Sequence, residues 1–182
     1  MKLIFLDIDG VLNYEGYERF TRSGTRFVDP VLIKRLKKII DRTGAKVVLS
    51  STWRRGIYDM LESISLPDGI ITFGTELFAD CTALKNIRLP KCLRYIPYGT
   101  FYDCKSLEVV TLPESVEIIG KNVFHGCTAL KEIAIPPKVE QLDELTFYGC
   151  TSLKRIYVSE KLSCLKKSAF MNCPSFKEII FY

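Results

Sequence analysis

Two carboxylates near the amino terminus have the spacing of a catalytic pair. Asp7 and Asp9 directly follow the apolar run at residues 2–6, and at two residues apart on an extended chain their side chains can leave the same face. Gly10 comes next and lets the backbone turn sharply beside a ligand. One carboxylate could attack a phosphoryl group in line while the other handles the leaving-group proton. An ordinary strand-to-loop turn is the alternative, because Asp and Gly also favour turns for backbone reasons.

Hydroxyl groups follow a second apolar run in the same way. Residues 45–49 are succeeded by Ser50 and Ser51, and a hydroxyl at this point could hold a non-bridging phosphate oxygen. If the two runs are parallel strands of one sheet, the carboxylates and hydroxyls meet at its carboxyl edge. A Mg²⁺ ion there would screen the charge of a transferring phosphoryl group. The constellation therefore suits phosphoryl transfer.

The elements that would position these side chains alternate between strands and helices. Buried strands are predicted at residues 2–6, 45–49 and 69–73. Residues 30–40 carry apolar side chains at close to helical spacing, with Asp29 and Pro30 as a start signal and Gly44 as a stop signal. A shorter helix is predicted around residues 57–64. The order β-α-β-α-β predicts an α/β fold with a parallel sheet and right-handed crossovers.

Two strings in this segment resemble the haloacid dehalogenase (HAD) superfamily. F-L-D-I-D-G-V-L-N is similar to its motif one and V-V-L-S-S-T-W-R to its motif two, and the likeness is greatest to small HAD domains in RNA-repair polyproteins of bacteria. The resemblance implies that Asp7 is the nucleophile forming an aspartyl phosphate and that Asp9 is the general acid and base. It implies Mg²⁺ on the Asp7 carboxylate and the Asp9 backbone carbonyl, and phosphate on Ser50, or on Ser51 if the strand ends one residue later. Arg54 is either a further phosphate contact or a solvent-facing side chain.

A 23-residue repeat occupies the rest of the chain. Its units share the pattern F-x-x-C-x-x-L-x-x-I-x-L, usually followed by proline. The cysteines of the successive units are Cys81, Cys104, Cys127, Cys150 and Cys173. The I-x-L alternation predicts one strand in each repeat, and stacked units would bury their apolar columns in a solenoid with a parallel sheet. Four full units and a partial fifth span residues 78–182, after a truncated HAD-like domain at residues 1–77.

The repeat resembles the BspA-like class of leucine-rich repeats. The likeness covers residues 78–182 and implies a curved surface that binds a protein or another ligand, without chemistry of its own. The cysteine column is interpreted as small buried side chains beside the strands. A metal or redox ladder is the alternative, although one thiol per rung, about 5 Å apart, does not make a tetrahedral ligand set. His125, the only histidine, stands where sister units carry Tyr or Met and is interpreted as a surface variant.

Composition and charge exclude several classes of protein. With 47% hydrophobic and 26% charged residues the chain is globular, and no apolar run approaches the roughly 20 residues of a membrane span. The odd number of cysteines, seven, and the short apolar start predict reduced thiols in the cytoplasm. The net charge of +5 divides into +2 (12 Lys and Arg less 10 Asp and Glu) in residues 1–77 and +3 (14 less 11) in residues 78–182. Neither half has a concentrated basic field, so a nucleic-acid partner is not expected.

Two further HAD motifs are missing. A HAD enzyme also needs a third-motif Lys or Arg and a fourth-motif acidic pair, but the repeats begin at Phe78, directly after the third predicted strand. Mg²⁺ prefers six oxygen ligands, so a site without the fourth-motif carboxylates should hold the ion weakly. The strand at residues 2–6 also loses its neighbour in the HAD sheet, and bare edges invite pairing. Either a second copy covers this edge, or the half-domain docks on the first repeat as its cap.

Two functions stay open on this evidence. The first is a protein-interaction module in which a degenerate HAD-like half-domain caps a leucine-rich solenoid, with little or no turnover. The second is a Mg-dependent HAD-type phosphohydrolase whose repeats select the substrate or partner. A protein partner is expected on the repeat surface, and a homodimer could form through the edge at residues 2–6 or through the uncapped carboxyl-terminal repeat.

Overall fold

The predicted strands of the amino-terminal segment form one parallel sheet. The computed structural model describes residues 3–6, 38, 46–49, 62–66 and 68–182. The sheet contains β1 (Leu3–Leu6), β2 (Lys46–Leu49) and β4 (Ile70–Phe73), in the order β1-β2-β4. These strands coincide with the three predicted apolar runs. Lys38 is helical; the rest of the helix predicted at residues 30–40 lies outside the described residues.

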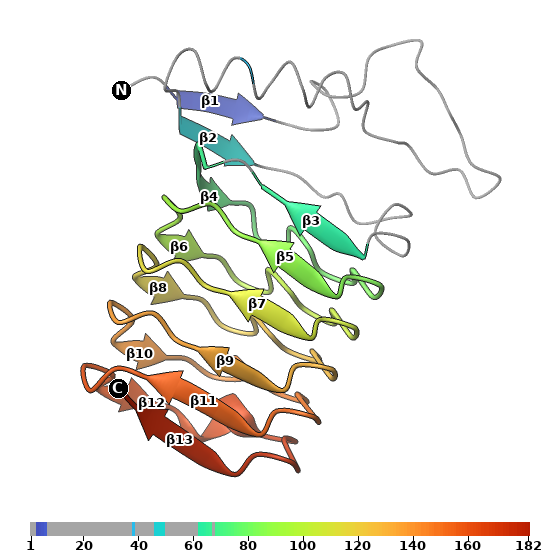
Figure 1. Ribbon diagram of the computed structural model, residues 1–182, viewed down its shortest axis with the longest axis vertical. Coiled ribbons are helices and arrows are strands. Elements are labelled where there is room, and N and C mark those ends of the chain that lie inside the picture. The colour runs from blue at the N-terminus through green and yellow to red at the C-terminus, as the bar shows by residue number, and fades with distance from the viewer. Residues whose placement is uncertain (1–2, 7–37, 39–45, 50–61, 67) are drawn as a thin grey trace, which may run out of the picture.

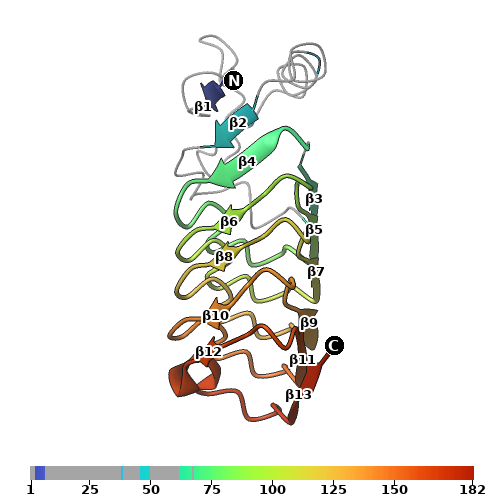
Figure 2. The ribbon, with the colours of Figure 1, turned by 90° about the vertical axis from the view of Figure 1, so that its left-hand side faces the viewer.

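The repeats form a β-solenoid with two strand columns, which run side by side in Figures 1 and 2. The first column contains β3 (Ser63–Ser65), β5 (Asn86–Arg88), β7 (Val109–Thr111), β9 (Glu132–Ala134), β11 (Arg155–Val158) and β13 (Glu178–Phe181). The second contains β6 (Tyr95–Ile96), β8 (Ile118–Ile119), β10 (Gln141–Leu142) and β12 (Cys164–Leu165), with the short 3₁₀ helix η1 (Lys167–Phe170) after it.

The expectation of one strand in each repeat is therefore wrong. A second strand forms in the segment after the proline, where the chain again alternates between exposed and buried residues. In β6, for example, Tyr95 is exposed and Ile96 is buried, and both pair in parallel with the equivalent residues of β8. In the sequence this segment offers only one exposed and one buried residue in each repeat. Such a short alternation does not predict a strand until the equivalent segment of the next turn pairs with it.

The strand ladder of the repeats begins before Phe78. Ser63–Ser65 forms β3 and pairs with Asn86–Arg88, so the two strands are offset by one repeat interval. The helix predicted around residues 57–64 is therefore wrong at its carboxyl end, because pairing with the next turn overrides helical spacing; residues 57–61 lie outside the described part of the chain. A domain boundary at residue 77 stays a prediction.

The strand β4 joins the amino-terminal sheet to the solenoid. It pairs with β2 on one side and lies beside β6 on the other, so it takes the place of a second-column strand in the first turn. Figure 2 shows β4 in line with the strands of that column. The amino-terminal sheet thus meets the first repeat through β4, while β1 lies at the opposite end of the strand order β1-β2-β4; what covers the β1 edge stays a prediction. A homodimer through the β1 edge stays a prediction.

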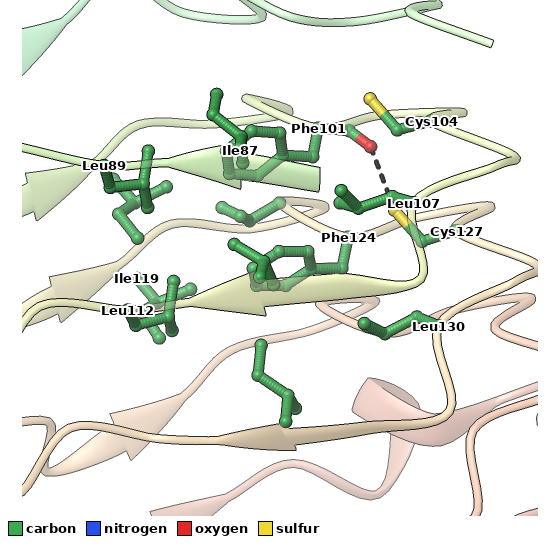
Figure 3. Packing of buried hydrophobic residues seen from close by; sticks show 14 of the residues in the cluster. Ile87, Leu89, Phe101, Cys104, Leu107, Leu112, Ile119, Phe124, Cys127 and Leu130 are labelled. Carbon is green, nitrogen blue, oxygen red and sulfur yellow. Dashed lines mark hydrogen bonds between the residues drawn. The ribbon is translucent and has the colours of Figure 1, made fainter. Parts of the chain in front are cut away.

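A column of phenylalanine rings runs through the core of the solenoid. Rings in successive turns are stacked, with centroids 5.4–5.7 Å apart and interplanar angles of 3–12°. The column consists of Phe78, Phe101, Phe124, Phe147 and Phe170. Truncating a buried ring to alanine typically costs about 3–5 kcal/mol, so this column accounts for a large part of the cohesion between turns. Figure 3 shows Phe101 and Phe124 among the leucine and isoleucine side chains that surround them.

The cysteine column has a structural role that the sequence did not show. The thiols of the last four cysteines of the column each donate a hydrogen bond to the carbonyl oxygen of a phenylalanine in the preceding turn, and Figure 3 marks the bond from Cys127 to Phe101, 3.2 Å. Equivalent bonds of 2.9–3.0 Å start at Cys104, Cys150 and Cys173. Burial raises the pKa of Cys127 and Cys150, which keeps them as thiol donors. These bonds support the space-filling interpretation and add a link between turns.

Burial of the cysteine column predicts a graded reactivity toward iodoacetamide in the native protein. Cys127 and Cys150 should stay unmodified at mildly alkaline pH, because both thiols are buried and their pKa values are raised. Cys92 and Cys164, which are only half-buried, should be modified first. Peptide mass spectrometry with time would measure the order, and concentrated urea should make all sites react. Equal rates at Cys127 and Cys164 would contradict the prediction.

Helices long and apolar enough to cross a bilayer are not found among the described residues.

Candidate interaction surface

The residues of the predicted phosphoryl-transfer site lie outside the described part of the chain. They are Asp7, Asp9, Gly10, Ser50, Ser51 and Arg54. The described strands supply only their frame: Leu6 lies opposite Leu49 in the parallel pair β1-β2, so the strands that precede Asp7 and Ser50 end side by side. This arrangement agrees with a site at the carboxyl edge of the sheet. The roles of the six residues, and of Asp7 and Asp9 as Mg²⁺ ligands, stay predictions.

The outer side of the first strand column is an exposed surface, here called the sheet face. In each short strand the central residue is buried and its two neighbours point outward, as in β5, β7 and β9. The sheet face consists of Asn86, Arg88, Val109, Thr111, Glu132, Ala134, Arg155, Tyr157, Glu178 and Ile180. Val109 is 60% exposed although it is apolar.

Polar side chains on the sheet face contact one another across neighbouring strands. Arg155 Nε lies 3.6 Å from Glu178 Oε1. The Tyr157 hydroxyl donates to Glu132 Oε2 at 3.5 Å. A side-chain hydrogen bond with Tyr157 raises the pKa of Arg155, and the charge of Glu178 adds to the effect. The carboxylates of Glu132 and Glu178 are therefore already engaged within the face.

A row of charged residues lies beside the sheet face, one residue before each strand of the first column. It consists of Glu62, Lys85, Glu108, Lys131, Lys154 and Lys177. Lys85 Nζ lies 3.0 Å from Glu62 Oε2 and Lys131 Nζ lies 3.5 Å from Glu108 Oε2. We call this set the charged row. Sequence reasoning missed it, although extending the repeat interval to the charged positions could have found it.

The single histidine is part of a ring stack on the turns that follow the second column. The His125 ring lies between Tyr102 and Tyr148, with centroid distances of 4.3 and 4.6 Å, and its side chain is 21% exposed. Its Nδ1 is 4.0 Å from Asp103 Oδ1. Burial lowers the pKa of His125 below its ordinary value of 6.5, although Asp103 opposes the shift. The interpretation of His125 as a surface variant is wrong, because stacking across turns buries most of the ring.

The lowered pKa of His125 predicts a pH dependence of stability. The unfolded chain binds the proton more readily than the folded one, so the contribution of neutral His125 is present above about pH 6.5 and is lost as the pH falls below it. His125→Tyr, which copies the residue at positions 102 and 148, should remove this loss. Urea unfolding from about pH 7.5 down to about pH 5.5 would measure it. Equal losses in wild type and variant would contradict the assignment.

Comparison with known families identifies the repeats. The profile described as "BspA type Leucine rich repeat region" matches residues 58–180 in six copies, which is more than half of the chain. The chain belongs to the BspA-type leucine-rich-repeat family. A second profile, "HAD domain in Swiss Army Knife RNA repair proteins", matches residues 3–85. The BspA-type match and the HAD match overlap at residues 58–85, the segment that contains β3 and β4.

Solved structures similar to this BspA-type chain are leucine-rich-repeat proteins. The T. pallidum protein TpLRR is 28% identical with a TM-score of 0.64, over 76% of this chain and 64% of that one. A protein from Bacteroides ovatus ATCC 8483 is 26% identical with a TM-score of 0.56, over 76% of this chain and 38% of that one. The chain therefore spans less than two thirds of these proteins. A search of curated proteins gave no match.

Proposed function

We propose that the BspA-type solenoid is a protein-interaction module and that the sheet face is its binding surface. Val109 is the observation that supports this assignment. It is an apolar side chain, 60% exposed, and its neighbour in register on β5 is the polar Asn86. Apolar residues surrounded by polar ones are typical of the centre of a protein interface.

Two further features of the sheet face favour protein binding. Tyr157 and Arg155 lie on the same strand, β11, and Tyr and Arg are the residue types that most often dominate binding energy at interfaces. Each strand is held by its neighbours in a fixed register, so the side chains are positioned before a partner arrives. A preorganised surface loses less conformational entropy on binding than a mobile one.

The proposal predicts that Val109→Glu weakens binding while a matched change on the other column does not. Peptides from a displayed random library would first be selected on the full chain. Their affinity for Val109→Glu should fall about tenfold, equivalent to about 1.4 kcal/mol, because a charge enters the apolar centre of the face. Ile118→Glu is the control, since Ile118 is also a β-branched apolar residue, 52% exposed, on the second-column strand β8.

The opposite pattern would overturn the assignment to the sheet face. If Ile118→Glu weakens the selected peptides and Val109→Glu does not, the second column is the binding surface. Circular dichroism and urea unfolding of both variants would show that each one is folded.

A Mg-dependent HAD-type phosphohydrolase is the second candidate. Its support is the parallel order β1-β2-β4 with Leu6 opposite Leu49, which agrees with Asp7 and Ser50 meeting at one edge. In this proposal Asp7 is the nucleophile, Asp9 the general acid and base, and Ser50 the phosphate contact. Clusters of three or more His, Cys, Asp or Glu that could hold a metal are not found in the described part of the chain.

Hydrolysis of p-nitrophenyl phosphate separates the two candidates. The interaction proposal expects no turnover above background with or without Mg²⁺, because the later HAD motifs are missing. Asp7→Asn and Asp9→Asn should then leave both folding and peptide binding unchanged. Turnover by the wild type that needs Mg²⁺ and disappears in both variants would instead establish the phosphohydrolase.

A further inference from the structure

The charged row changes its pattern in the last two turns of the solenoid. Its first four members alternate in sign, as Glu62, Lys85, Glu108 and Lys131, and form the two ion pairs of 3.0 and 3.5 Å. Continued alternation would place an acidic residue at position 154. The chain instead carries Lys154 and then Lys177, so three lysines follow one another.

These three lysines are neighbours in space. The amide of Lys154 donates to the carbonyl of Lys131, and the amide of Lys177 to the carbonyl of Lys154, both at 2.8 Å. Adjacent strands lie about 4.7–4.9 Å apart, and like charges directly opposite one another destabilise a sheet. Of the ion pairs formed within the described residues, none includes Lys154 or Lys177. Lys131 is paired with Glu108, whereas the repulsion between Lys154 and Lys177 is not neutralised by an ion pair in this part of the chain.

The surrounding charge reinforces this contrast. Residues 147–182 contain six Lys and Arg and two Glu, a net charge of +4, whereas residues 101–146 contain four Lys and eight Asp and Glu, a net charge of −4. Residues 78–100 contain four Lys and Arg and one Asp, a net charge of +3. The basic charge of the repeats therefore lies in the first and last turns, with acidic turns between them.

An apolar stripe runs along the sheet face next to these lysines. Tyr157 lies in register between Ala134 and Ile180. Glu132 and Glu178 lie on the same face and are engaged by Tyr157 and Arg155, so negative charges of a ligand would meet the lysines beside the face, and its apolar side chains would meet the stripe. The surface therefore complements a ligand that combines negative charges with apolar side chains.

We propose that the sheet face binds an acidic protein segment in which carboxylates alternate with apolar side chains. The carboxylates pair with Lys154 and Lys177, and the apolar side chains pack on Tyr157 and Ile180. The inference rests on the proposed function, because it specifies the partner of the same face. Its physical basis is that a bound acidic segment relieves the repulsion that the free protein carries.

Charge reversal at Lys154 tests the inference in two ways. Lys154→Glu restores the alternation of the charged row, so its urea-unfolding midpoint should rise, whereas its affinity for an acidic peptide should fall about three- to tenfold. Lys161→Glu is the matched control: Lys161 is exposed in the same turn and the change in net charge is identical, but the residue is outside both the charged row and the sheet face. It should change neither the midpoint nor the affinity.

The probes are three short labelled peptides of equal length, in which the same apolar residues alternate with Glu, with Gln or with Lys, and an oligodeoxythymidine. Fluorescence anisotropy with the full chain should show binding of the Glu peptide, weakened by added salt. The inference is overturned if the Glu peptide does not bind, if the Gln or Lys peptide binds equally well, or if the oligonucleotide binds more tightly. It is also overturned if Lys161→Glu has the same effect as Lys154→Glu, or if Lys154→Glu leaves the unfolding midpoint unchanged.

Failure of the inference can be distinguished from failure of the proposed function. If library-selected peptides bind in a Val109-dependent manner but carry no acidic residues, the sheet face is the binding surface and only the partner chemistry is wrong. If no selected peptide responds to Val109→Glu, the proposed function itself fails.

Discussion

Register between turns is the constraint on which the rest of this structure depends. The first-column strands pair with their neighbours at an offset of one repeat interval within β3-β5-β7 and within β9-β11-β13, so each paired residue lies beside its own equivalent in the adjacent turn. Phenylalanine therefore stacks on phenylalanine, and the thiols of Cys104, Cys127, Cys150 and Cys173 donate to a carbonyl of the turn before. A shift of one residue would exchange the buried and exposed faces of each strand. The buried columns thus fix the strand pairing, and the pairing determines which exposed side chains lie next to one another on the surface.

The same constraint explains how the two parts of the chain can be continuous. A sheet edge is a row of unpaired backbone groups, and a solenoid needs its terminal turn covered. Here β4 pairs with β2 and lies beside β6, so the amino-terminal sheet extends the second strand column of the repeats. The overlap of the two family matches at residues 58–85 falls on this junction. One segment therefore satisfies the strand pattern of both families.

Stacking of equivalent residues also explains why surface features of this protein come as rows. In a solenoid, equivalent positions of successive turns lie next to one another, so a charge repeated once in every turn forms a line of charges at strand spacing. Opposite signs in such a line stabilise the stack, as at Glu62 and Lys85, whereas like signs oppose it. A row of like charges next to an apolar stripe is therefore a departure from what stability alone would favour, and such departures are expected at functional surfaces.

The sequence by itself determined the repeat, its interval, the buried columns and the three strands of the amino-terminal sheet, because hydrophobic periodicity is a local signal. It did not determine the second strand of each turn, the strand at Ser63–Ser65 or the burial of His125, because each depends on contacts with the equivalent residues of a neighbouring turn. The charged row likewise became a feature only when the turns were stacked. Tertiary structure decided these points because strand pairing joins residues that the local pattern treats as independent.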